Sequence, residues 1–424
     1  MTLARQASCH KSSERDYPVT PPPGIPPHVI FFLLYNLLYL LPLLFAFLLD
    51  YEEGGVAAAL NVSGDVLLKV CYVYGVGACS FFAGSGALRF LTWSKYGRCF
   101  PPQSFPLLQI GFPEWIAIGT LLVVFIVSKV ALIPSGVYHE YAFDSGSMTG
   151  GLWSFSTFCS EAMILAALLP LFSSSKYGLR AFLIISGINA INLLHGTRLF
   201  FISSAMALIL FAYIKRKLTF KVLLLYGPIA GSAMLLLAYL TFLSRSAINP
   251  AGSFTAAKLL SPIMYESVFS QMSLLSVIKN PEMWGGFPNA IWFVHDLFLF
   301  VSPRFVMPEK DASLFIGQYA WVSPLGAFNG YAQGLVYFGL LFPTFYFFLG
   351  LLGTWLYRRA QANPWWFVFY ALFTEDFLLH LMRDGYLIPL KMLINSATLL
   401  CLFVVSRFVL LACRPSLGEL VKSA

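Results

Sequence analysis

The chain has 424 residues, of which 58% are hydrophobic and only 11% are charged, and its formal net charge is +8. Soluble domains average about 25% charged residues, so this composition excludes a cytosolic enzyme, a disordered chain and a small disulfide-rich secreted protein. The apolar residues stand in long unbroken runs and lack the alternation typical of a membrane barrel. The sequence therefore predicts an all-α polytopic membrane protein.

The predicted elements begin with a polar, cytoplasmic tail, residues 1–28, which contains six prolines. A hydrocarbon core about 30 Å thick requires roughly 20 apolar residues per helix, and residues 29–243 hold seven such runs. A large external loop, residues 244–330, separates them from three further runs within residues 331–424, whose end is again cytoplasmic. The ten predicted spans are 29–49, 66–88, 114–133, 151–172, 179–194, 198–214, 220–243, 331–356, 365–381 and 386–412.

The distribution of charge predicts the orientation of these spans. Basic residues concentrate in the cytoplasmic segments of membrane proteins. Most of the 27 lysines and arginines here fall in the tail, the C-terminal end and alternate connections, whereas the first connection on the other side carries four acidic residues. Both termini are therefore predicted to be cytoplasmic. The positive net charge follows from topology, so we do not expect nucleic acid as a partner.

The external loop contains two apolar stretches of its own, 263–278 and 291–301. In the first, apolar residues recur at helical spacing, which predicts a helix lying on the membrane surface. The seven cysteines are scattered, mostly within apolar runs, and are expected to pack as small apolar side chains, without disulfides or a metal site.

Four arginines are predicted on the external side, where topology disfavours basic residues. They stand at the ends of spans or within the loop, and a lysine in the loop is a fifth cation. Arginine binds phosphate in a bidentate manner, and a helix N-terminus adds oriented N–H donors. One such arginine alone is usually an interfacial anchor, but the set points to a shared anion-binding cavity. These residues are Arg198, Arg245, Arg304, Arg383 and Lys310.

Three acidic residues lie inside predicted spans, where an ionisable side chain is costly. Glu161 is in the middle of 151–172, and Glu375 and Asp376 are in 365–381. They are interpreted either as neutral groups in helix–helix hydrogen bonds or as partners for a basic residue such as Arg383 or Lys391.

A general base is expected on the external side. The best histidine candidates are His295, followed by Asp296, and His195 beside Arg198, and the best carboxylate candidate is Glu266. The run Glu309-Lys310-Asp311 resembles an acidic pair that holds a divalent ion, but a lysine separates the two acids. Neither a metal ion nor a cofactor is therefore expected.

Four local patterns stand out, and together they cover roughly residues 190–400. They are Gly196-Thr197-Arg198 opening an apolar helix, Pro303-Arg304 followed by Lys310, Ser323-Pro324-Leu325-Gly326 with Asn329 and Tyr331, and Arg383-Asp384-Gly385 between the last two spans. As a set, these patterns resemble the motifs of the O-antigen polymerase family. One departure is Asp311, which stands where many relatives have proline after the lysine.

The resemblance implies a GT-C-like glycosyltransferase in the bacterial inner membrane with a periplasmic active site. It would transfer a growing glycan from undecaprenyl pyrophosphate onto a new lipid-linked repeat unit. Arg198, Arg304 and Arg383 would bind the pyrophosphate, and Arg245 and Lys310 would support them. Catalysis would rest on Arg304 together with a base, Glu266 or His295. The expected partners are undecaprenyl-pyrophosphate-linked oligosaccharides, the lipid bilayer and a chain-length regulator.

Two alternatives stay open at this point. An O-antigen ligase has similar topology but moves finished glycan onto lipid A core. A lipid-linked sugar flippase or transporter would use the arginines to bind an anionic substrate in transit. In a transporter the charges should line a path across the membrane, whereas the four arginines are predicted on one side.

Overall fold

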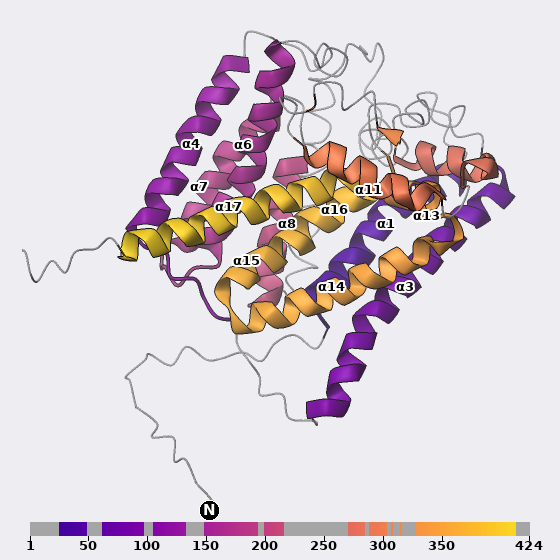
Figure 1. Ribbon diagram of the computed structural model, residues 1–424, viewed down its shortest axis with the longest axis horizontal. Coiled ribbons are helices and arrows are strands. Elements are labelled where there is room, and N and C mark those ends of the chain that lie inside the picture. The colour runs from indigo at the N-terminus through magenta and orange to yellow at the C-terminus, as the bar shows by residue number, and fades with distance from the viewer. Residues whose placement is uncertain are drawn as a thin grey trace, which may run out of the picture.

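A computed structural model describes residues 25–48, 62–96, 105–132, 148–193, 199–215, 270–284, 288–302, 307, 314–315 and 328–412. Within these ranges the protein is helical, and one isolated backbone bridge, between Leu108 and Ser173, is the only extended pairing. The predicted span 220–243 lies outside the described residues. Figure 1 shows the helices crossing one another as a single bundle.

The helices of the first half follow the predicted spans closely, and residues 270–279 begin the described part of the second half. In chain order the elements are α1 (Pro27–Leu48), α3 (Gly64–Tyr96), α4 (Phe112–Leu132), α6 (Met148–Leu171), α7 (Gly178–Asn189), η3 (Ala190–Leu193), α8 (Leu199–Ile214), η4 (Pro281–Trp284), α11 (Pro288–Val301), α13 (Gly330–Phe338), η7 (Gly339–Leu341), α14 (Phe342–Ala362), α15 (Pro364–Leu372), η8 (Phe373–Phe377), α16 (Leu378–Asp384) and α17 (Leu387–Ala412).

Five of the described helical segments are long and apolar enough to cross a membrane: α1, α3, α4, the α13–α14 pair and α17. Among the shorter apolar helices, α8 packs against α1, α11 packs against α13 and α17, and α7 packs against α6 and α8. Helices of this length and apolar composition are typical of membrane spans. The chain is thus a membrane-embedded protein, and its all-α character is confirmed for the described residues.

Two predicted spans are interrupted in ways that the apolar runs did not indicate. The span 331–356 breaks after α13, where Gly339 has a φ of 57°, before α14 begins. The span 365–381 contains a π-helical turn, η8, and continues to the end of α16. There Gly385, with a φ of 78°, turns the chain into α17. A side chain at Gly385 would be strained and would also lie 2.5 Å from Gln333.

Segments predicted to share the cytoplasmic side do meet at one end of the bundle. The Leu108 backbone N–H donates to the carbonyl of Phe172 over 3.0 Å, and Arg407 near the end of α17 donates to the carbonyl of Gln109 over 2.9 Å. Further contacts at this end join Arg358 to Leu88, Tyr213 to Ile25 and His28 to Tyr370.

Described parts of the predicted external segments meet at the opposite end. The Ser270 hydroxyl donates to the carbonyl of Met382 over 3.2 Å, and the Asn289 amide donates to the carbonyl of Val336 over 2.8 Å. In Figure 1 these elements, including α11 and α13, lie along the upper part of the bundle, and the turn between α14 and α15 lies below.

The predicted surface helix 263–278 differs from the structure where it is described. Residues 270–279 are helical, but Ser270, Gln271 and Leu274 are fully buried. The Gln271 side-chain amide donates to the carbonyl of Tyr39 over 3.1 Å and to the hydroxyl of Tyr74. This stretch therefore packs inside the protein against α1 and α3, and not on the membrane surface.

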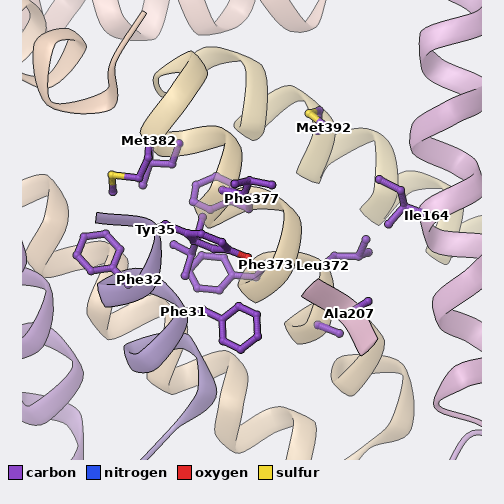
Figure 2. Close-up of a cluster of buried hydrophobic side chains, with 14 of the residues drawn as sticks. Phe31, Phe32, Tyr35, Ile164, Ala207, Leu372, Phe373, Phe377, Met382 and Met392 are labelled. Carbon is purple, nitrogen blue, oxygen red and sulfur yellow. The ribbon is translucent and has the colours of Figure 1, made fainter. Parts of the chain in front are cut away.

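The centre of the bundle forms around η8. Figure 2 shows Phe31 and Tyr35 of α1 close to Phe373 and Phe377 of η8. The Tyr35 hydroxyl donates to the backbone carbonyl of Glu375 over 2.9 Å. A π-helical turn widens the backbone and is frequent at functional sites, so the side chains on η8 and α16 are the natural place to look for one.

Candidate functional site

The structure describes two of the predicted site residues, Arg383 and His295. The other predicted site residues lie outside the described residues: Arg198, Arg245, Glu266, Arg304 and Lys310.

His295 lies on α11 and forms a pair with its neighbour. Its Nδ1 is 3.1 Å from Asp296 Oδ1, and its side chain is 39% exposed whereas that of Asp296 is fully buried. Asp296 also accepts hydrogen bonds from the Tyr337 hydroxyl over 2.6 Å and from the backbone of Phe315 over 2.8 Å. Asp296 therefore joins α11 to α13 and holds the imidazole of His295 in one orientation.

Arg383 belongs to a different group of side chains, which we call the α16 cluster. Four of its members lie on η8 and α16, and the fifth is a residue of α8. Arg383 lies 2.7 Å from Asp384 Oδ1, and His380 Nδ1 lies 2.6 Å from Asp384 Oδ2. The members are Ser203, Asp376, His380, Arg383 and Asp384.

The inner half of the α16 cluster continues the same series of contacts. His380 Nε2 lies 3.6 Å from Asp376 Oδ1, and that oxygen accepts a hydrogen bond from the Ser203 hydroxyl over 2.7 Å. The spacing 376, 380, 384 places one side chain on each successive turn of helix, so all three lie on one face. The side chains of Asp376, His380 and Asp384 are 7%, 4% and 5% exposed, against 18% for Arg383.

Further ionisable groups surround the α16 cluster. Glu161 of α6 accepts a hydrogen bond from the Asn395 amide of α17 over 3.2 Å and interacts electrostatically with Asp376, His380 and Lys391. The ammonium of Lys391 lies 5.0 Å from the centre of the Phe300 ring. Arg383 and Lys391 were the basic partners expected for the acidic residues within the spans. Glu161 does interact with Lys391, whereas Arg383 pairs with Asp384.

Glu375, which precedes Asp376 on η8, is fully buried. Among the residues that the structure describes, neither of its carboxyl oxygens has a hydrogen-bond partner. Leaving a buried polar group unsatisfied costs about 1–3 kcal/mol. Ionisable residues buried in membrane bundles usually belong to functional sites, and an unsatisfied carboxyl group at this position lowers stability.

We therefore expect methionine in place of Glu375 to raise the free energy of unfolding by about 1–3 kcal/mol, because an apolar side chain leaves no unsatisfied oxygen. Thermal unfolding of the detergent-solubilised protein measures this. The matched control is Asp376→Leu, which removes the partner of Ser203 and should lower the midpoint. A lower midpoint for Glu375→Met would show that this carboxyl group has a partner in the native protein.

The α16 cluster can perform two kinds of chemistry. The guanidinium of Arg383 can bind an anion, and the alternation of carboxylate and imidazole can hold or pass a proton. No group of three or more His, Cys, Asp or Glu side chains is arranged to hold a metal ion within the described part of the chain.

The sequence predicts Arg383 as a site residue but not the residues that hold it. Asp384 belongs to the Arg383-Asp384-Gly385 pattern but has no predicted role, and neither His380 nor Ser203 has one. The repeat of ionisable residues at 376, 380 and 384, four residues apart, is the signal that could have found them.

Fold and site define the class: a membrane-embedded helical protein with a buried ionic cluster near one end of its bundle. Comparison of the chain with known protein families, with characterised proteins and with solved structures finds no match in any of the three.

Proposed function

We propose that the chain is a polymerase of surface polysaccharide resembling the O-antigen polymerases. It would be a GT-C-like glycosyltransferase of the bacterial inner membrane with about ten spans and cytoplasmic termini. It would transfer the growing glycan from undecaprenyl pyrophosphate to a lipid-linked repeat unit on the periplasmic face. One observation carries the proposal: the guanidinium of Arg383 is held by a buried carboxylate at the end where the predicted external segments meet.

The reaction explains why a held arginine would be useful. The acceptor hydroxyl oxygen attacks the anomeric carbon, and the bond from that carbon to the diphosphate oxygen breaks. Negative charge grows on the leaving diphosphate, and a donor oriented in advance stabilises that charge without reorganising, an effect worth a few kcal/mol. Arg383 would act in this way beside Arg198, Arg245, Arg304 and Lys310.

The acceptor hydroxyl must lose its proton to a base. Glu266 and His295 both remain proposed for this role. The geometry of His295 supports it, because Asp296 orients the imidazole. The proton would then pass to water on the same side of the membrane.

A transporter of lipid-linked sugars is a second candidate, and one observation favours it. The ionisable side chains of the α16 cluster continue from Arg383 toward the interior, as in substrate or ion pathways. Toward the opposite end, however, the described interior is aromatic. Phe105 stacks on Phe367 with ring centres 4.5 Å apart, and Phe172 also packs on Phe367. The polymerase is therefore preferred.

The proposal is tested by a gel of surface polysaccharide from a deletion strain complemented with wild type. We expect the deletion to reduce the ladder to core plus one repeat. Polymer retained on the lipid carrier, with no capped core, would identify a ligase instead. Loss of the single-repeat band as well would favour a flippase, and an unchanged ladder would contradict all three.

A further inference from the structure

The contacts around Arg383 form one continuous chain of side chains from α16 to α8. We propose that Asp384 and His380 are positioning residues that fix the guanidinium of Arg383 for binding a diphosphate group, and that Asp376 and Ser203 anchor them. This inference rests on the proposed function and names residues that act through Arg383.

Asp384 uses both of its carboxylate oxygens, and each has a different partner. Oδ1 lies 2.7 Å from the Arg383 guanidinium, and Oδ2 lies 2.6 Å from His380 Nδ1. A carboxylate engaged at both oxygens cannot rotate about its terminal bond without breaking a contact. The guanidinium bound to it therefore loses part of the rotamer freedom that a surface arginine retains.

The second nitrogen of His380, Nε2, faces Asp376 but makes no hydrogen bond among the described residues, so this contact is electrostatic. Asp376 lies 3.6 Å from Nε2, and the Ser203 hydroxyl fixes the same Asp376 oxygen from α8. All three side chains are almost fully buried, where electrostatic contacts are stronger than in water. The chain of contacts thus begins in the rigid interior.

Side-chain exposure is higher at the Arg383 end of this series of contacts than at the Ser203 end, as a binding site requires. The residues from Ser203 to Asp384 are buried, and Arg383 is the most exposed member. A purely structural ion pair would be satisfied by burial of both partners. Here the acid is buried and the cation lies at the boundary, which is the arrangement of a cation presented to an anion.

The same series of contacts connects α8, through η8, to α16. Ser203 lies just over one turn from the start of α8 at Leu199, the residue that follows Arg198 in the sequence. The hydrogen bond from Ser203 to Asp376 therefore joins α8 to η8, the turn that leads directly into α16. Loss of Asp376 should disturb Arg383 through two intermediate residues.

The experiment measures binding of inorganic pyrophosphate to the purified full-length protein in lipid nanodiscs by isothermal titration calorimetry. We expect wild type to bind and Arg383→Ala to bind at least tenfold more weakly. Asp384→Asn should weaken binding about tenfold, as loss of a supporting partner typically does. In the Arg383→Ala background, Asp384→Asn should have no further effect, because its action passes through the arginine.

Two substitutions of His380 distinguish a positioning role from a role in folding alone. His380→Asn keeps an N–H donor near the position of Nδ1 and should retain most of the affinity, whereas His380→Leu should lose as much as Asp384→Asn. This pair decides the question if Asp384→Asn fails to fold. The matched control is Glu114→Gln, which removes a buried carboxylate 3.5 Å from Arg407 at the opposite end and should bind pyrophosphate as wild type does.

The outcomes distinguish the two proposals. If Arg383→Ala weakens binding but Asp384→Asn and His380→Leu bind like wild type, the positioning role is wrong and the anion site stands. Equal losses from Asp384→Asn with and without Arg383 would also overturn the positioning role. If wild type does not bind pyrophosphate, the diphosphate site and its positioning residues both fall.

Discussion

Lysine in place of Arg383 is expected to lower the rate of glycan transfer by about 10²–10³, nearly as much as alanine does. The ammonium of lysine keeps the charge and can still pair with Asp384. It lacks the planar fork that holds a carboxylate and a phosphate at the same time. Removing one donor oriented toward developing negative charge costs about this factor in turnover. Turnover of a lipid-linked repeat by the purified protein, followed by gel mobility, measures it.

Arg359→Lys is the matched control for this prediction. Arg359 lies in the last turn of α14, its guanidinium 5.5 Å from the ring of Trp355, near the end of the bundle opposite to Arg383. Its replacement should leave turnover unchanged. Thermal unfolding of Arg383→Lys should match wild type, because the ion pair with Asp384 persists. Wild-type turnover by Arg383→Lys would remove Arg383 from the proposed diphosphate site.

The sequence allowed most of the described helices to be predicted because membrane helices have a required length. The run 114–133 corresponds to α4, Phe112–Leu132, within two residues. The interruption at Gly339 could not be predicted, since it lies inside a continuous apolar run. The π-helical turn η8 contains Glu375 and Asp376, but two acidic residues in a span do not distinguish a π-helical turn from a regular helix. Whether an interrupted helix kinks or continues depends on which neighbours satisfy the freed backbone groups.

The surface helix was predicted wrongly where it is described because its pattern has two explanations. An apolar stripe at helical spacing suits both the membrane surface and the protein interior. The polar side chains decide between them, and here Ser270 and Gln271 are buried in hydrogen bonds with α16, α1 and α3. Those partners lie more than one hundred residues away, so no local pattern contains them.

The candidate site was predicted in part for a similar reason. Arg383 stood out because topology disfavours a cation on its side. Its partner proved to be Asp384, the next residue in the sequence. Which acidic residue of η8 joins the cluster depended on side-chain direction, because Glu375 and Asp376 are adjacent and consecutive helical residues point about 100° apart. Only Asp376 joins the α16 cluster, and Glu375 has no hydrogen bond among the described residues. A π-helical turn shifts this phase further, and a regular helix drawn from the sequence misses that shift.

The second large effect concerns the packing of α3 against α14. The two helices approach so closely that a Cβ on Gly84 would lie 1.9 Å from the carbonyl oxygen of Phe347, and one on Gly350 would lie 2.1 Å from that of Phe81. Membrane helices rely on such small residues, because packing replaces the hydrophobic effect inside lipid. The obstructing atoms are backbone, which cannot rotate aside as a side chain would. Gly84→Leu should therefore separate the helices and leave little folded protein.

The yield of monodisperse Gly84→Leu protein after detergent extraction measures this effect. The smaller substitution Gly84→Ala should lower the free energy of unfolding by about 1–3 kcal/mol, as overpacking commonly does. Gly86→Ala is the matched control on the same helix, because a Cβ there meets no atom within 4 Å. Alanine favours helix over glycine by about 1 kcal/mol, so Gly86→Ala should be neutral or stabilising. The two substitutions add the same methyl group two residues apart. Opposite signs would assign the loss at Gly84 to contact with α14, whereas equal losses would mean that the helices do not approach as closely as the structure has them.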